Sequence, residues 1–149
     1  QDARAVTFMG ENKPGVDTGA TIQLQTTQVK GADRRSYLKA NSELQVTLRM
    51  QEAPDSNMSL GLQCGWPCGK ALEVAPALRQ LPVGKWVTLS LPLSCLQDDM
   101  DFTKVNTPFI FATNGKARLD LATVRWVPAT LVQPDKDLMQ LDCQGQLKK

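Results

Sequence analysis

The sequence predicts an all-β protein, folded as an antiparallel jelly-roll β-sandwich with one short helical segment. Two observations lead to this prediction. Apolar and polar residues alternate with period two through most of the chain, and short clusters of turn-forming residues separate the alternating runs. Because successive side chains of a strand point to opposite faces, each run offers one face to a core and one to solvent. Several such strands with little helix are typical of a sandwich.

The alternating runs are the expected strands. In one of them Leu44, Val46 and Leu48 alternate with Gln45 and Thr47. The six expected strands cover residues 20–28, 43–50, 57–64, 85–95, 107–113 and 117–127.

Turn chemistry marks the connections between these runs. Pro54 and Asp55 suit the start of a turn, and the pair Asn114-Gly115 between two alternating runs is a strong hairpin signal. Residues 71–81 instead space their apolar side chains for one face of a helix, although Pro76 lies among them. Since proline is tolerated in a first turn, we expect a helical turn that begins near Pro76 and lies across one end of the sandwich.

Length and composition suit one sandwich domain over residues 1–128, followed by a more polar tail extension over residues 129–149 that wraps back or frays. The opening QDARAVTFMG lacks the pattern of a signal peptide, so we expect a piece of a longer protein. No apolar run approaches the roughly 20 residues that span a bilayer, so membrane insertion is not expected.

The chain contains no histidine, which excludes mechanisms and metal sites that use imidazole. A formal net charge of +2 gives no electrostatic footprint for nucleic acid, so no nucleic-acid partner is expected.

Four cysteines leave the pairing open. Cys64 and Cys68 lie four residues apart in a turn that contains Gly65 and Pro67. A disulfide is favoured over two reduced thiols, and both are favoured over half of a metal site. Cys95 pairs with Cys143 if the tail folds back, but four cysteines allow three connectivities.

The order of motifs from residue 58 to 128 carries a family resemblance. LGLQCGWPCG is followed by LPVGKWVTLSLPLSC and then by DFTKVNTPFIFATNGKARLDLATVRWVP. This order resembles the ExoP-type C-terminal domain that follows the catalytic domains in many Gram-negative family 3 glycoside hydrolases, exo-acting β-glucosidases and 1,4-β-glucan glucohydrolases. The opening QDAR is similar to the start of that domain.

The resemblance implies a galactose-binding-like jelly roll in a periplasmic or secreted protein, with the catalytic domains of the same polypeptide as its partner. Family 3 catalysis uses an Asp nucleophile and a Glu acid/base in domains that have no counterpart here, so the chain alone is not expected to be an enzyme. Asp98, Asp99 and Asp101 are interpreted as solvated loop carboxylates. No cofactor or metal is expected, with a structural calcium ion at this loop or near the start of the sandwich as the minor alternative.

Sugar binding uses an aromatic platform beside planar polar groups. Trp66 at the tip of the cysteine loop is the first candidate, with exposure and a lid over the sandwich as equal alternatives. Trp86 and Trp126 fall within strands and are expected to be structural. A second candidate cluster, for which a solvated charged loop is the favoured interpretation, contains Asp33, Arg34, Arg35 and Tyr37.

Three functions follow from these observations. The first is an accessory domain that packs on the catalytic domains of its own enzyme and shapes substrate access. The second, ranked just below, is a carbohydrate-binding module that holds β-glucan oligosaccharides. The third, ranked well below, is a stand-alone adhesion or protein-recognition sandwich.

Overall fold

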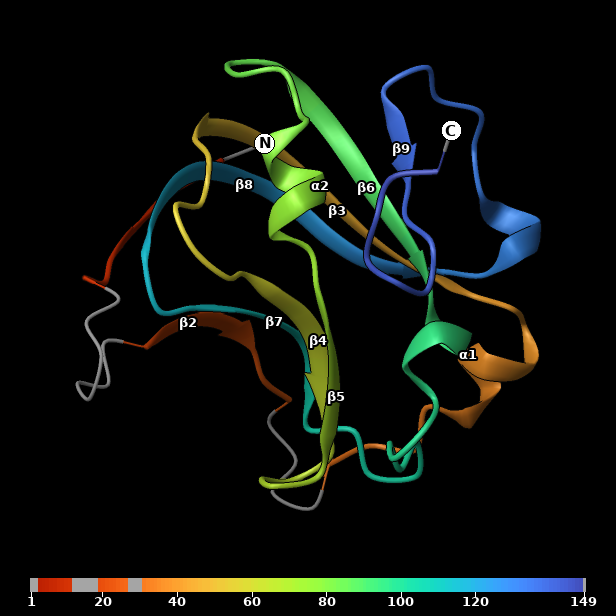
Figure 1. Cartoon of the computed structure of the whole chain (residues 1–149). Helices are drawn as coiled ribbons and strands as arrows, with labels where there is room; N and C mark the ends of the chain where they lie inside the picture. Colours follow the sequence, from red (N-terminus) through yellow and green to blue (C-terminus); the bar gives the residue numbers. More distant parts are fainter. Residues whose placement is uncertain (1–2, 12–18, 27–30, 149) are drawn as a thin grey trace.

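The computed structural model describes residues 3–11, 19–26 and 31–148, and its strands form two facing sheets (Figure 1). In spatial order, the five-stranded sheet contains β1 (Arg4–Met9), β8 (Lys116–Val127), β3 (Glu43–Glu52), β6 (Trp86–Pro92) and β9 (Leu138–Gln140). The four-stranded sheet contains β2 (Ala20–Leu24), β7 (Thr107–Thr113), β4 (Ser59–Gln63) and β5 (Gly69–Glu73). This arrangement confirms the predicted all-β sandwich.

The core lies between the two sheets and is built from the apolar faces of the predicted strands. Leu44, Val46 and Leu48 of β3 are fully buried, as are Phe109 and Phe111 of β7. The two phenylalanine rings meet edge to face, with centroids 5.1 Å apart. Burying each such side chain contributes about 1.5–3 kcal/mol, so the period-two pattern supplies the main stabilisation of the fold.

The predicted strand boundaries differ from those observed mainly at the ends. Residues 107–113 coincide with β7, whereas residues 93–95 leave the predicted strand 85–95 and begin the 3-10 turn η1 (Leu93–Leu96). The end of the predicted strand 20–28, at residues 27–28, lies outside the described residues. Strands β1, β5 and β9 were not predicted. Residues 71–73, which the sequence analysis included in the run with helical spacing, belong to β5, and the three residues of β9 are too few to show a period.

One strand pair departs from the predicted antiparallel arrangement. β9 pairs with β6 in parallel, with Leu138 opposite Thr88 and Gln140 opposite Ser90. A parallel neighbour needs a long crossover, which the segment from residue 93 to residue 137 provides. The last part of that crossover leaves β8, passes through the 3-10 turn η2 (Ala129–Leu131) and enters β9 beside β6 (Figure 1).

The tail therefore wraps back, which was one of the two predicted alternatives. Leu141 is fully buried in the core, and its backbone N–H donates to the Ser90 carbonyl at 2.8 Å. A disulfide joins Cys95 of η1 to Cys143, with 5.0 Å between the Cα atoms. This bridge confirms the pairing expected for a folded-back tail.

The prediction of one short helical segment is incomplete. Helix α2 (Ala75–Arg79) contains Pro76 in its first turn, as expected, and lies at the connection from β5 to β6 (Figure 1). A second short helix, α1 (Arg35–Lys39), occupies part of the segment interpreted as a solvated loop. Its start is favoured because the Asp33 carboxylate accepts the backbone N–H of Arg35 at 3.1 Å, a local bond typical of turns.

Candidate functional site

The loop between β4 and β5 holds Trp66 in an exposed position. A disulfide joins Cys64 to Cys68, with 5.0 Å between the Cα atoms, and the Cys64 N–H donates to the Cys68 carbonyl at 2.8 Å. Gly65 adopts a φ of 91°, which favours glycine. The Trp66 side chain is 83% exposed. A lid over the sandwich is thus excluded for Trp66, and the predicted disulfide of this loop is confirmed.

A groove of about 340 Å³ lies beside Trp66 on the outer face of the four-stranded sheet. Its floor includes Ala71 of β5 and both Ile110 and Ala112 of β7, which lie at outward positions of their strands. Gln63, Lys70 and Thr21 add polar groups at its edges. The groove therefore combines an aromatic ring, an apolar floor and polar hydrogen-bonding groups.

The strands of this face approach closely at Gly61. Gly61 of β4 lies opposite Ala71 of β5 and Ile110 of β7. A Cβ atom added at Gly61 would lie 2.2 Å from the Lys70 carbonyl oxygen and 2.7 Å from the Ala71 Cα. No larger residue fits there without separating β4 from β5.

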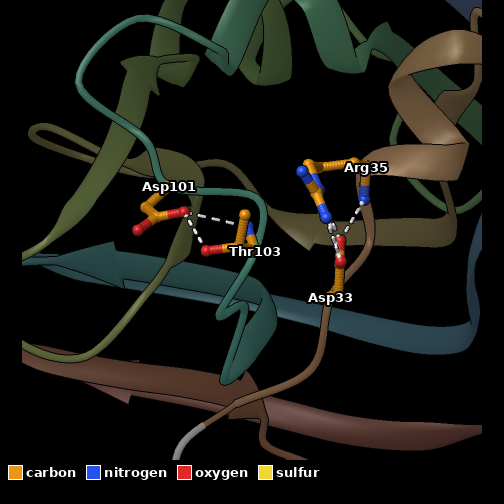
Figure 2. Close-up of polar contacts among 4 residues, drawn as sticks. All are labelled: Asp33, Arg35, Asp101 and Thr103. Carbon is orange, nitrogen blue, oxygen red and sulfur yellow. Dashed lines mark hydrogen bonds and ion pairs between the residues drawn. The ribbon is translucent and has the colours of Figure 1, made fainter.

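Charged residues at the start of α1 form a local ion pair. The Arg35 guanidinium donates to the Asp33 carboxylate from Nε at 3.0 Å and from Nη2 at 2.7 Å, and Figure 2 shows the two groups facing each other. These hydrogen bonds lower the pKa of Asp33 to about 2. Both side chains are exposed, so the pair fixes a turn and contributes little to stability.

Tyr37 packs against the sandwich and does not form an open platform. Its ring meets the Trp126 ring edge to face, with centroids 5.3 Å apart. The Trp126 Nε1–H donates to the Pro108 carbonyl at 2.9 Å, which confirms the predicted structural role of this tryptophan. Arg34 and Arg125 lie beside these two rings around a hollow of about 210 Å³.

The acidic loop after η1 lies beside the same end of the sandwich. The Asp101 carboxylate accepts hydrogen bonds from the Thr103 backbone N–H at 2.9 Å and from its hydroxyl at 2.5 Å (Figure 2). These bonds lower the pKa of Asp101. The Asp101 backbone N–H lies 3.4 Å from the Cys64 sulfur, so this loop supports the disulfide loop that carries Trp66.

The lowered pKa values of Asp33 and Asp101 favour the ionised form of both carboxylates. The pKa of Asp120 is also lowered, by hydrogen bonds from Gln51 and Arg49. A general acid of a glycosidase needs the opposite shift, because it must be protonated near neutral pH. Within residues 3–11, 19–26 and 31–148, no three or more acidic or cysteine side chains are grouped so that they could hold a metal ion. No helix of this described part is long and apolar enough to cross a membrane.

The structure separates the predicted sugar-binding residues into two places. Trp66 borders the groove on the four-stranded sheet, whereas Tyr37 and Arg34 border the hollow near Trp126. The Cys64–Cys68 loop lies between the groove and the Asp33–Arg35 pair, since Cys68 borders both regions. Sequence reasoning did not select the small outward residues of the groove floor, although their alternation with buried leucines was visible.

A match to a protein-family model defines the class of protein to which the chain belongs. Residues 1–126 match the model of the family Exop_C, described as galactose-binding domain-like. The fold and this match define a galactose-binding-like β-sandwich, as the resemblance implied. The chain belongs to the Exop_C family. No curated protein matches the chain in sequence.

Solved structures share the fold. The exo-1,3/1,4-β-glucanase ExoP from a Pseudoalteromonas species matches with a TM-score of 0.68 and 18% identity, over 95% of this chain and 15% of that protein. The extra C-terminal domain of the same enzyme matches with a TM-score of 0.67 and 18% identity, over 94% and 68% of the two chains. PfGH50B matches with a TM-score of 0.51 and 11% identity, over 85% and 22%. The chain thus spans about 15% of the length of the glucanase.

Proposed function

We propose that this chain is a non-catalytic accessory domain of a family 3 glycoside hydrolase of the exo-β-glucosidase type. Membership of the Exop_C family and the likeness to the C-terminal domain of a glucanase support this proposal. In the proposed role the domain packs on the catalytic domains of the same polypeptide and shapes substrate access. Two disulfides favour a periplasmic or secreted location, because such bonds persist in oxidising compartments.

The exposed Trp66 beside the apolar groove of the four-stranded sheet is the observation that carries the packing role. A tryptophan that is 83% exposed on a disulfide-closed loop presents a large apolar area at little entropic cost. The apolar groove floor, with Ala71, Ile110 and Ala112, adds area that can pack against another rigid domain. The groove beside Trp66 is therefore the proposed contact surface.

A second candidate function, a module that binds β-glucan oligosaccharides, uses the same surface. The ring face of Trp66 suits stacking on a pyranose, while Gln63 and Lys70 at the edges of the groove suit its hydroxyls. Titration of the chain with cello- and laminari-oligosaccharides, followed by tryptophan fluorescence and heat, separates the two candidates. Saturable binding that disappears in Trp66→Ala but persists in Val83→Ala, a control at another exposed apolar residue, supports the binding module.

The packing role has its own test. Hydrogen exchange is measured on the isolated chain and on the longer parent polypeptide. We expect slower exchange at residues 59–71 and 107–113 in the parent polypeptide, because the contact surface is then covered. Equal exchange in both, together with saturable oligosaccharide binding, would reject packing in favour of the binding module.

A further inference from the structure

A hollow of about 210 Å³ opens between the two sheets, beside the edge strand β2. Strands β2 and β7 border it from the four-stranded sheet, β8 borders it from the five-stranded sheet, and α1 closes the remaining side. Its apolar and aromatic lining consists of Leu24, Tyr37, Pro108, Val124 and Trp126. None of the residues around it borders the groove beside Trp66, so the two places are separate.

The apolar wall of this hollow suits an aromatic ring. The rings of Tyr37 and Trp126 are half-buried and meet edge to face, with centroids 5.3 Å apart. Leu24 at the end of β2 is 47% exposed, although it is a large apolar side chain. A ring placed in the hollow covers Leu24 and gains the face or edge contacts that aromatic pairs favour.

Arg34 is a cation without a counter-ion beside this wall. It is half-buried, and within residues 3–11, 19–26 and 31–148 its guanidinium forms no hydrogen bond and no ion pair. Asp33, its neighbour in the sequence, is held by the backbone N–H and the guanidinium of Arg35. None of the described residues that border the hollow is acidic. The Arg34 guanidinium therefore offers a planar set of donors that matches a carboxylate.

Arg125 also borders the hollow, but its side chain belongs to the other face of the sheet. Trp126 faces the core side of β8, where its Nε1–H donates to the Pro108 carbonyl of the facing sheet, and neighbours on a strand point to opposite faces. Arg125 accordingly borders a second hollow on the outer face, together with Asp135. Arg34 is thus the cation that a ligand between the sheets would reach.

We propose that this hollow binds a small aromatic carboxylate. The ring lies against Tyr37, Trp126 and Leu24, and the carboxylate accepts hydrogen bonds from the Arg34 guanidinium. A neutral aromatic ligand forgoes the charge-assisted hydrogen bonds, and an inorganic anion leaves the apolar wall uncovered. The proposal does not depend on the accessory role proposed above, because it uses other residues.

Titration of the full chain with benzoate, followed by two-dimensional NMR of the indole and arginine N–H groups, tests the proposal. We expect saturable shifts of the Trp126 Nε1–H and the Arg34 Nε–H. Affinity falls about tenfold or more in Arg34→Gln, because charged hydrogen bonds are lost. This variant is expected to fold, since the Arg34 side chain forms no hydrogen bond or ion pair within the described residues. Leu24→Ala, a change at an exposed position, weakens binding through the ring.

Two further ligands separate the parts of the site. Benzyl alcohol keeps the ring without the charge, and acetate keeps the charge without the ring. Each is expected to bind about tenfold more weakly than benzoate or worse, because each loses one of the two contacts. Benzyl alcohol binding as tightly as benzoate would overturn the proposal in favour of an apolar pocket, and acetate binding as tightly would overturn it in favour of a general anion site.

Arg118→Gln is the matched control, because Arg118 is an exposed arginine of β8 that does not border the hollow. It and Trp66→Ala are expected to leave the affinity for benzoate unchanged. An absence of shifts at the Trp126 Nε1–H at millimolar benzoate would overturn the proposal. A loss of affinity in Arg118→Gln equal to that in Arg34→Gln would do the same, since it would show an effect of overall charge.

Discussion

At the scale of single residues, Trp66 and Trp126 show that the contacts of a tryptophan side chain determine whether it supports the fold or is free to bind a partner. Trp126 packs against Tyr37 and Phe102, and its indole N–H is bonded to a backbone carbonyl. Trp66 is 83% exposed on a loop that a disulfide closes. The first is partly buried and packs against the core, and the second is available to a partner.

The difference in burial predicts that replacement by alanine lowers the free energy of unfolding far more at Trp126 than at Trp66. Trp66→Ala is expected to change the free energy of unfolding by less than about 0.5 kcal/mol, because little is buried. Trp126→Ala is expected to cost about 3 kcal/mol, since it leaves a cavity and an unpaired Pro108 carbonyl. Urea denaturation of both variants checks this. A loss in Trp66→Ala as large as that in Trp126→Ala would show that Trp66 supports the fold.

The lowered pKa of Asp33 predicts that the stability of the fold depends on pH. This pKa is about 2 in the folded chain against an ordinary value of 3.8, because Arg35 hydrogen-bonds the ionised form. The exposed pair therefore adds a small stabilisation above pH 3.8, reduced by solvent screening, and this contribution is lost as the pH falls toward 2. Asp33→Asn is expected to be less stable than the native chain at neutral pH, with the difference shrinking between about pH 4 and about pH 2.

Unfolding curves measured across this pH range check the prediction for Asp33. Arg35→Ala is the control, because it returns the Asp33 carboxyl toward its ordinary pKa and should remove the same pH dependence. A constant difference between Asp33→Asn and the native chain at every pH would contradict the assignment.

At the scale of elements, the pairing of β4 with β5 depends on Gly61. Gly61→Ala is expected to cost about 1–3 kcal/mol, because its Cβ would lie 2.2 Å from the Lys70 carbonyl and force the two strands apart. Gly84→Ala is the comparison: it has open space but a φ of 80°, so its cost of about 1–2 kcal/mol is backbone strain alone. A Gly61→Ala variant with native stability would show that β5 moves freely.

The two disulfides close loops of different length and should differ in their effect on stability. Cys95 and Cys143 are 48 residues apart, whereas Cys64 and Cys68 are four apart. In the chain-entropy model these loops correspond to about 4 and about 2 kcal/mol. Replacing Cys95 and Cys143 by alanine should therefore lower the free energy of unfolding more than replacing Cys64 and Cys68. Denaturation of the two double variants checks the order, and the reverse order would contradict it.

The elements also show what the sequence could predict. Strand β7 coincides with its predicted residues because Phe109 and Phe111 alternate cleanly with smaller side chains. Strand β9 was missed because three residues carry no period, and its partner β6 lies about 50 residues earlier in the chain. Trp66 was selected from its position in a loop, but its exposure depends on how the disulfide loop sits against the Asp101 segment.

The burial of Gln45, which is 6% exposed, lay beyond sequence reasoning for the same physical reason. Gln45 occupies a polar position of an alternating strand, which predicts contact with solvent. It is buried because the tail closes over this face after a crossover and a disulfide that join distant segments. Local patterns predict the strands and the core face, whereas sites formed by distant segments require the folded chain.

At the scale of the whole molecule, the tail decides how far the sandwich extends. The change in composition predicts a boundary at residue 128, and the family match ends at residue 126. In the structure, the tail beyond this point contributes the edge strand β9 and the fully buried Leu141. Its removal would uncover the edge of β6, and uncovered strand edges promote aggregation.

A chain truncated after residue 128 is therefore expected to be less stable than the full-length variant without the Cys95–Cys143 disulfide. The disulfide variant loses only the covalent link, whereas the truncated chain also loses the burial of Leu141, about 2–5 kcal/mol for a core leucine. Urea denaturation and light scattering of the two proteins, with Cys95→Ala in both, test this comparison. Equal unfolding midpoints without aggregation would instead show that residues 129–149 are an extension on a sandwich that folds without them.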